Sequence, residues 1–244
     1  MDACGGTDCI LRRAFRQDDG EFFAADTGCR VHASFAQLHL LRDSLQDSVA
    51  GRVAVVDIGG GSTEFVVGDA EVGASVSENV GCVRMTERHL RSDPPTADEI
   101  AAATVEIDAA VLHARQATGF DTADRIVGLA GSVTTGAALA MGLPEYDSAR
   151  IHASRISAAQ VHQVTLRMLA ATRAERAAEP VMHPGRVDVI GGGALVLDRI
   201  LTLGGFDEVI VSEHDILDGI ALNLAQGRPV GFAAGRDAAA LPGP

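Results

Sequence analysis

The chain contains no lysine, and all 20 of its basic residues are arginine. Because no lysine amine is present, mechanisms that need a P-loop lysine, a Schiff base or a lysine general base are excluded. Tryptophan is absent as well, and tyrosine occurs once. Since 47% of the residues are nevertheless hydrophobic, we expect a core built mainly from the aliphatic residues Val, Ile, Leu and Ala.

Positive charge is scarce, because the formal net charge of the chain is −13. An acidic surface repels the phosphate backbone of nucleic acids, so we expect no nucleic-acid polymer among the partners. The same acidity opposes any polyanionic substrate unless arginines are concentrated at its binding site. A bound metal ion could supply the positive charge that the side chains lack.

Long apolar runs are missing, and no stretch approaches the ~18 residues that cross a bilayer. The N-terminus also lacks the apolar segment of a signal peptide. The four cysteines have no metal-ligand spacing, and we expect them to be reduced thiols (Cys4, Cys9, Cys29 and Cys82). These features predict a soluble cytoplasmic protein with no membrane partner.

The most informative stretch is residues 53–68, VAVVDIGGGSTEFVVG. Two short apolar runs, 53–58 and 63–67, are rich in β-branched residues and predict two strands joined by a glycine-rich loop. The loop glycines are Gly59, Gly60 and Gly61. Glycine lets the backbone come close to a ligand, so that successive N–H groups can surround an anion.

Polar side chains surround this loop in a pattern that suits phosphate and Mg²⁺. Ser62 and Thr63 follow the glycines and add hydroxyl groups. Asp57 and Glu64 stand before and after the loop, and their hard oxygen atoms are the ligands that Mg²⁺ prefers when it also contacts phosphate. The alternative is a glycine hairpin with two solvated carboxylates, but the combined pattern favours a phosphate site.

The remaining pattern predicts an α/β fold in the order βββ, α, α, β, α, α, α, β, α. Thr96–Glu99 and Ser157–Gln160 have the sequence of helix capping boxes. The expected strands are 53–58, 63–67, 74–80, 125–129 and 208–212, and the expected helices are 83–90, 96–114, 134–141, 157–171, 172–175, 187–203 and 215–224. This order predicts a ribonuclease-H-like mixed sheet, with an antiparallel three-stranded meander flanked by helices.

Segment 187–203 allows two interpretations, because Gly191, Gly192 and Gly193 look like a second phosphate loop. Its apolar residues nevertheless recur every three or four positions straight through the glycines. This period favours a helix, even though each glycine costs a helix about 1 kcal/mol relative to alanine. Such glycines would let a neighbouring backbone or a nucleotide lie close.

We expect three segments in the 244-residue chain. Residues 1–50 show weak periodicity, residues 51–226 contain the predicted fold, and residues 227–244 are rich in Ala, Gly and Pro and form a loose tail.

Five segments occur in an order and at spacings that are typical of one family: DIGGGSTEFVVG (57–68), VGCVRMTERHL (80–90), GLAGSVTT (128–135), MHPGRVDVI (182–190) and SEHDILDGIAL (212–222). Over roughly residues 50–225 the chain resembles the exopolyphosphatase / guanosine pentaphosphate phosphohydrolase (Ppx/GppA) phosphatase family. This family is a branch of the actin–sugar kinase–Hsp70 superfamily. A lone GGGS would be weak evidence, whereas five ordered motifs are specific.

The resemblance implies the second of two ribonuclease-H-like halves, and an enzyme that releases terminal phosphate from inorganic polyphosphate or from guanosine pentaphosphate (pppGpp) with Mg²⁺. The family's second phosphate loop matches Gly59–Ser62, and its metal-binding carboxylates match Asp57 and Glu64. Its second glycine turn matches Gly131 and Ser132. Arg84 lies in a matched motif and is a candidate for holding a phosphate oxygen; a structural salt bridge is the alternative.

The chain also departs from the family pattern. Members carry an N-terminal half with its own phosphate loop, whereas here 1–50 lacks such a motif, and we expect it to be a divergent remnant of that half. The family's catalytic glutamate lies shortly before the second loop. The corresponding residues 32–40 contain no carboxylate, so the catalytic base is not assigned.

Two other classes of function remain open. A noncatalytic phosphate- or nucleotide-binding relative could act through oligomerisation, for example as a homodimer, because half a cleft leaves apolar surface exposed. An ATP-using kinase of the wider superfamily is the other class, although the five matched segments argue against it.

Overall fold

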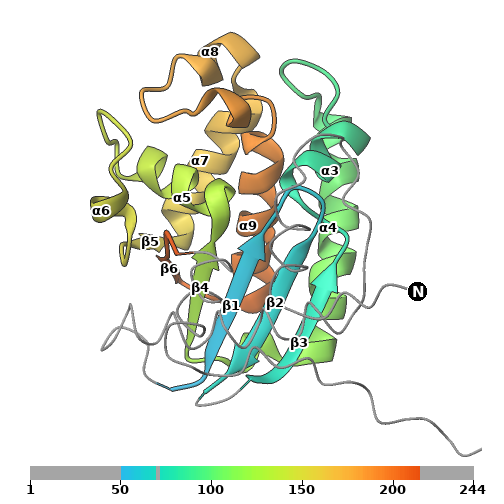
Figure 1. Ribbon diagram of the computed structural model, residues 1–244. Coiled ribbons are helices and arrows are strands. Elements are labelled where there is room, and N and C mark those ends of the chain that lie inside the picture. Colours follow the sequence, from blue (N-terminus) through green and yellow to red (C-terminus); the bar gives the residue numbers. More distant parts are fainter. Residues whose placement is uncertain (1–50, 70–71, 215–244) are drawn as a thin grey trace, which may run out of the picture.

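The computed structural model describes residues 51–69 and 72–214, which form one mixed sheet flanked by helices (Figure 1). The strands are β1 (Val53–Ile58), β2 (Thr63–Gly68), β3 (Val72–Glu78), β4 (Arg125–Leu129), β5 (Arg155–Ser157) and β6 (Glu208–Val211). Their order across the sheet is β3-β2-β1-β4-β6-β5. The predicted α/β fold class is therefore confirmed.

The sheet combines an antiparallel and a parallel part. β1, β2 and β3 form the predicted antiparallel meander, whereas β1, β4 and β6 run parallel to one another. β5 pairs antiparallel with β6 and was not predicted, because three residues are too short to show a period. Parallel neighbours bring the carboxyl ends of β1 and β4 to the same edge of the sheet.

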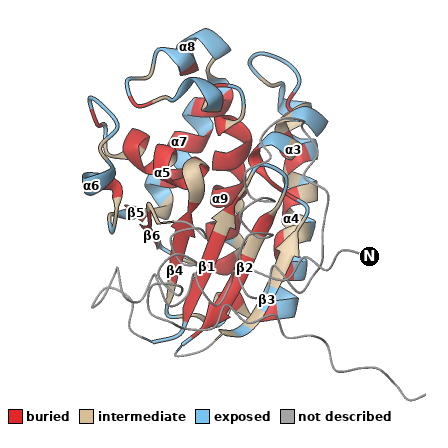
Figure 2. Ribbon diagram, viewed as in Figure 1, coloured by how far each residue is buried: buried red, intermediate tan, exposed pale blue. Residues whose placement is uncertain are grey.

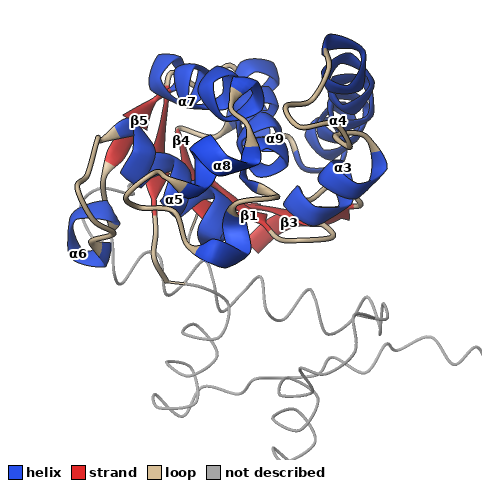
Figure 3. Ribbon diagram, turned by 90° about the horizontal axis from the view of Figure 1, so that it is seen from above, coloured by secondary structure: helices blue, strands red, loops and turns tan. Residues whose placement is uncertain are grey.

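The helices are α3 (Cys82–Arg88), α4 (Ala97–Thr118), α5 (Ala130–Ala140), α6 (Ser148–Ile151), α7 (Ala158–Ala170), α8 (Arg173–Ala177) and α9 (Ile190–Gly204), with 3₁₀ turns η2 (Phe120–Thr122) and η3 (Pro184–Arg186). Seen from above the sheet, α4, α7 and α9 lie together on one of its sides (Figure 3). None of these described helices is both long and apolar enough to cross a membrane.

Alternation along β1 divides its side chains between two apolar clusters. Ala54, Val56 and Ile58 share the main core with buried residues of α4, α5, α7 and α9. Val53 and Val55 belong to a second cluster on the opposite face, which among the described residues contains strand residues only. Because side chains alternate along a strand, Asp57 lies on this second face, at the carboxyl end of β1. Buried residues fill the central strands and α9 (Figure 2).

Local capping explains where several helices begin. The side chains of Thr96 and Glu99 form the predicted capping box at the start of α4, and those of Ser157 and Gln160 form one at the start of α7. A third box, Thr172 with Glu175, opens α8. The predicted helix starts at these positions are therefore confirmed.

The ambiguous segment is a helix, as its period predicts, because α9 runs through all three glycines. A Cβ atom on Gly192 would lie 2.9 Å from the carbonyl oxygen of Cys82 in α3. A Cβ atom on Gly193 would lie 2.5 Å from the Cβ atom of Ser132 in α5. These glycines therefore serve close packing of α9 against two helices.

Two expectations need comment. α5 begins at Ala130 and not at Thr134, so the predicted glycine turn Gly131-Ser132 forms the first turn of this helix. The expectations for residues 1–50, for a helix at 215–224 and for a loose tail at 227–244 lie outside the described residues, as do the domain boundaries that depend on them.

We predict that Gly193→Ala lowers the free energy of unfolding by about 1–3 kcal/mol, because the new methyl group must push α5 away from α9. The matched control is Gly136→Ala in α5, where a Cβ atom would have no neighbour within 4 Å. This control should raise stability by up to about 1 kcal/mol through helix propensity. Urea denaturation of both variants measures the difference, and equal effects would contradict the packing argument.

Candidate phosphate-binding site

The two glycine segments that the sequence singles out lie at one edge of the sheet. The loop after β1 and the first turn of α5 after β4 both follow the carboxyl ends of parallel neighbours (Figure 1). In α/β sheets, ligands bind outside this edge. The geometry therefore brings Gly59–Ser62 and Gly131 to the place where a ligand site is expected.

The carbonyl groups of the loop are bound to the start of α3. The Gly59 carbonyl accepts a hydrogen bond from the N–H of Cys82 at 3.0 Å, and the Gly60 carbonyl accepts from the next two N–H groups of α3 at 2.9 and 3.0 Å. No side chain caps α3, so these carbonyls cap it instead. Because a trans peptide directs N–H opposite to C=O, the N–H groups of Gly60 and Gly61 point away from α3.

These amide groups are available to a ligand. Within residues 51–69 and 72–214, the N–H groups of Gly60, Gly61 and Ser62 have no acceptor. Gly60 and Gly61 are exposed to solvent. Consecutive backbone N–H groups that lack a protein acceptor form a binding site for an anion such as phosphate.

Gly81 fixes this loop from the side of α3. A Cβ atom at this position would lie 2.6 Å from the Gly60 oxygen and 2.7 Å from the Gly59 oxygen. Only glycine fits so close to backbone atoms that cannot move independently. The conformation of the loop therefore depends on a residue that lies some twenty positions further along the chain.

Arg84 reaches the loop from α3. Its Nε atom donates to the Gly61 carbonyl at 2.6 Å. In the described part of the chain neither Nη atom has an acceptor, and the structural salt bridge left open by the sequence is not formed there. The two Nη amino groups thus remain beside the loop amides, where they could bind phosphate oxygens.

Asp57 and Glu64 face each other across β1 and β2. They form a directly opposed pair in the antiparallel register, so their side chains lie on the same face of the sheet. The Oε1 atom of Glu64 accepts hydrogen bonds of 2.7 Å from the hydroxyls of Ser62 and Ser77. Opposed carboxylates repel each other, and a divalent cation between them would relieve this repulsion.

The two carboxylates suit Mg²⁺ better than a metal ion whose ligands all come from protein side chains. No group of three or more His, Cys, Asp or Glu residues is arranged to hold a metal ion within the described ranges. Mg²⁺ is commonly held by one or two carboxylates, with water and phosphate oxygens as its other ligands. The pair Asp57 and Glu64 matches this arrangement.

Two of the predicted hydroxyl ligands have other roles. Thr63 is fully buried, and its hydroxyl donates to the Val80 carbonyl at 2.6 Å. The Ser62 hydroxyl donates to Glu64. The prediction that the Thr63 hydroxyl donates to phosphate is therefore corrected, because this hydroxyl holds the segment after β3 to β2. The Ser62 hydroxyl orients a carboxylate, and its contact with phosphate stays a prediction.

Ser132 also differs from its predicted role. It is 2% exposed, and its hydroxyl lies against Gly193 in α9 without a hydrogen-bond partner among the described residues. Its side chain is thus turned into the core and away from the edge of the sheet. The prediction of a phosphate-binding Ser132 side chain is corrected, whereas the backbone of Gly131 stays at the edge.

Arg186 is the residue that the site prediction missed. A Cβ atom on Gly131 would lie 1.6 Å from the guanidinium carbon of Arg186, so this side chain lies directly on the first turn of α5. Its guanidinium has no hydrogen-bond acceptor or ion-pair partner in the described part of the chain. Arg186 lies in the segment MHPGRVDVI, one of the five that carry the family resemblance, and this position is the feature of the sequence that could have pointed to it.

Tyr146 lies beside α5, close enough to Arg186 for the two side chains to interact electrostatically. Its hydroxyl contacts the Thr134 hydroxyl at 2.8 Å and the Glu213 carboxylate at 2.7 Å. The pKa of Tyr146 is raised from 10 to about 12, and the largest cause of this shift is burial of the phenol. The hydrogen bond with Thr134 lowers the pKa, whereas Glu213 raises it further. The phenol therefore keeps its proton well above neutral pH, and no sequence signal pointed to it.

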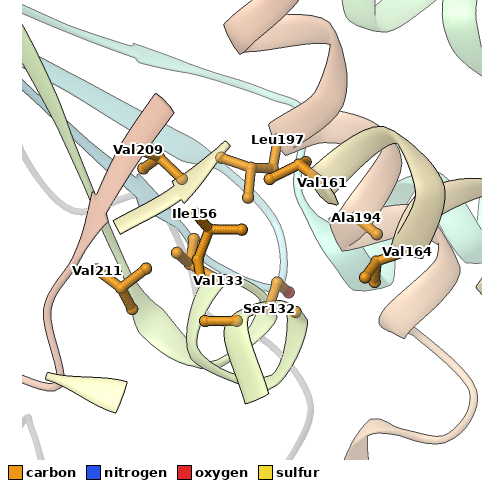
Figure 4. Close-up of a pocket in the computed structure, with 11 residues that line it drawn as sticks. Ser132, Val133, Ile156, Val161, Val164, Ala194, Leu197, Val209 and Val211 are labelled. Carbon is orange, nitrogen blue, oxygen red and sulfur yellow. The ribbon is translucent and has the colours of Figure 1, made fainter. Parts of the chain in front are cut away.

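An apolar cavity in the core is not the site. It lies between α5, α7 and α9 and the strands β5 and β6, and its only polar lining residue is Ser132 (Figure 4). Its volume of about 10 Å³ holds about one water molecule. A phosphate chain cannot enter this cavity.

We predict that the single tyrosine of the chain titrates with a pKa of about 12 in the native protein and about 10 in urea. Absorbance at 295 nm reports this ionisation, and circular dichroism checks the fold at each pH. Because the native pKa is raised, the stabilisation is fully present below pH 10 and is lost as the pH rises through 12. Glu213→Gln should lower the native value; a native pKa near 10 would contradict the network.

Comparison with known proteins agrees with the geometry. The family model described as "Ppx/GppA phosphatase family" matches residues 43–226. Exopolyphosphatase 2 of Mycobacterium tuberculosis is 48% identical over 182 residues, which cover 73% of this chain and 57% of the relative. The chain thus spans little more than half the length of this relative.

Solved structures give the same result. The crystal structure of an exopolyphosphatase-like protein matches with a TM-score of 0.72 and 40% identity, and the match covers 75% of this chain and 62% of that one. The Aquifex aeolicus Ppx/GppA family member matches with a TM-score of 0.73 and 27% identity, over 81% of this chain and 62% of that one. Since the family model covers most of the sequence, the chain belongs to the Ppx/GppA phosphatase family.

Proposed function

We propose that the protein binds the terminal phosphates of inorganic polyphosphate at Gly59–Ser62 and releases phosphate from them with Mg²⁺. One observation carries this proposal: consecutive loop N–H groups that find no acceptor among the described residues lie next to two opposed carboxylates. Polyphosphate is the first choice of substrate because the 48% identical relative is named an exopolyphosphatase. Guanosine pentaphosphate, with the same terminal anhydride, is the second choice.

Each residue at the edge has a role in this proposal. The amides of Gly60 and Gly61 bind phosphate oxygens and stabilise the negative charge that spreads over them during transfer. Arg84 holds the loop through its Nε atom and offers its two Nη groups to the same phosphate. Arg186 extends the positive charge toward the first turn of α5.

Asp57 and Glu64 would hold the magnesium ion, and Ser62 and Ser77 keep Glu64 oriented through their hydroxyls. When bound, Mg²⁺ neutralises phosphate charge that this acidic chain otherwise repels. The need for such a cation is strong, since the net charge is −13 and the loop itself supplies only neutral amides.

Hydrolysis also needs a base that activates the attacking water. Among the described residues, the only carboxylates that border the loop in sequence are the two proposed metal ligands, Asp57 and Glu64. A general base typically contributes about 10²–10⁴ to the rate. This favours a second candidate function, a noncatalytic phosphate-binding relative that acts through oligomerisation. Both candidates share the binding site, and we place both in the cytoplasm, where polyphosphate and pppGpp would be met.

We predict that Asp57→Asn and Glu64→Gln each weaken Mg²⁺-dependent binding of tripolyphosphate at least about tenfold, because each removes one of two hard ligands. Isothermal titration calorimetry with and without Mg²⁺ measures the effect. Glu87→Gln is the matched control, since Glu87 is an exposed carboxylate on α3 that lies outside the opposed pair. Unchanged binding in both site variants would show that the loop is only a turn.

Phosphate release from long-chain polyphosphate and from pppGpp then separates the two functions. Release that requires Mg²⁺ and is lost in Asp57→Asn supports the hydrolase, and the ratio of the two rates identifies the substrate. Binding without release from either compound contradicts the hydrolase and supports the binding protein.

A further inference from the structure

Another pocket lies at the opposite edge of the sheet from the phosphate loop. Its volume is about 360 Å³, and it lies where β4 and β6 begin and where α9 ends. Because β1, β4 and β6 are parallel, this edge carries their amino ends, whereas the phosphate loop follows a carboxyl end (Figure 1). The five residues of β4 span roughly 16 Å between the two edges. This amino-edge pocket is therefore separate from the candidate phosphate site.

The amino-edge pocket has the size and the walls of a site for a small molecule. Ligand pockets have volumes of roughly 300–1,000 Å³, so this one suits a small ligand. Part of its wall is apolar and consists of Ala123, Ile126 and Phe206. The rest is charged and consists of four carboxylates and one arginine. An apolar wall can pack against methylene groups while the charged residues bind the polar ends of a ligand.

The arginine of this pocket, Arg125, lacks a partner. Within residues 51–69 and 72–214 its guanidinium forms no ion pair and has no hydrogen-bond acceptor, although its Nε atom is buried. A buried donor without an acceptor costs free energy, and native structures contain few of them. A ligand carboxylate in the pocket would supply the acceptor that the guanidinium lacks.

Two of the four carboxylates are neutralised by arginines outside the pocket. The Nε atom of Arg115 donates to Asp121 at 2.7 Å. Glu208, at the start of β6, pairs with Arg155 of the neighbouring strand β5. These two acidic residues therefore have cationic partners without any ligand.

The other two carboxylates have no cationic partner in the described part of the chain. The side chain of Asp207 forms no hydrogen bond or ion pair there. Asp124 accepts a hydrogen bond of 2.8 Å from the backbone N–H of Arg52, which leaves its charge uncompensated. The C-terminus of α9 adds partial negative charge beside them. The pocket thus presents two carboxylates and one guanidinium that a ligand could pair.

We propose that the amino-edge pocket binds a basic α-amino acid. Two cationic groups and one carboxylate, the charges of arginine or lysine, match the unpaired charges of the pocket. The ligand carboxylate pairs with Arg125, its cationic groups pair with Asp124 and Asp207, and its methylene chain packs on the apolar wall. An anion alone would face the carboxylates, and a cation alone would leave Arg125 unpaired. This inference does not depend on the proposed function.

Isothermal titration calorimetry of the full chain with L-arginine tests the proposal, and agmatine, which lacks only the carboxylate, is the matched ligand. We expect L-arginine to bind at least about tenfold more tightly, because agmatine gives Arg125 no acceptor. Non-specific attraction to a chain of net charge −13 would give the reverse order, since agmatine carries the larger positive charge. Tighter binding of agmatine, or no heat of binding from millimolar L-arginine, would overturn the proposal.

Variants then assign the contacts. Arg125→Gln should weaken L-arginine binding at least about tenfold without weakening agmatine, whereas Asp207→Asn should weaken both ligands. The matched controls are Arg150→Gln in α6 and Asp98→Asn in α4, because both residues are exposed and lie outside the pocket. They should change neither affinity, and neither should Asp57→Asn at the phosphate site.

Circular dichroism checks the fold of each variant. Because Asp207 is exposed, its variant should fold even if Arg125→Gln does not, and the comparison of the two ligands needs no variant at all. Binding of L-arginine that both Arg125→Gln and Asp207→Asn leave intact in folded protein would place the ligand elsewhere and overturn the proposal.

Discussion

The close packing of the α9 backbone against α3 and α5 is the constraint on which the rest of the structure depends. Gly192 and Gly193 let α9 lie against α3 and α5 at distances that a single methyl group would prevent. The position of α3 in turn decides where its first N–H groups lie, and these N–H groups fix the carbonyls of the phosphate loop. The direction of the free loop amides is therefore set by helix packing deep in the core.

This arrangement resolves the conflict between an acidic chain and an anionic ligand. The loop offers backbone N–H groups, whose dipoles attract phosphate without adding charged side chains. Arg84 and Arg186 add positive charge at this edge, and their guanidinium groups lack acidic partners among the described residues. Elsewhere arginines such as Arg199 and Arg176 are paired with aspartates and serve structure. Arginine is thus divided between stabilising the fold and facing the ligand edge.

Much of the fold could be predicted from the sequence, because its signals are local. The β-branched runs around the glycines predicted β1 and β2, the capping boxes located α4 and α7, and the period through Gly191–Gly193 predicted α9. Site roles that depend on side-chain direction could not be predicted. Neighbouring residues share a motif, but the backbone turns Thr63 and Ser132 into the core and leaves Gly61 at the surface. Arg186 meets Gly131 only through tertiary packing, which no spacing reveals.

The most direct test of this account observes the loop amides themselves. A ¹⁵N-labelled chain is titrated with tripolyphosphate and Mg²⁺, and backbone amide resonances are followed by NMR. The account predicts that the largest shifts occur at Gly60 and Gly61, with no comparable change at Gly136, which lies within α5. Binding that leaves the Gly60 and Gly61 resonances unmoved would contradict it, because phosphate would then be held elsewhere.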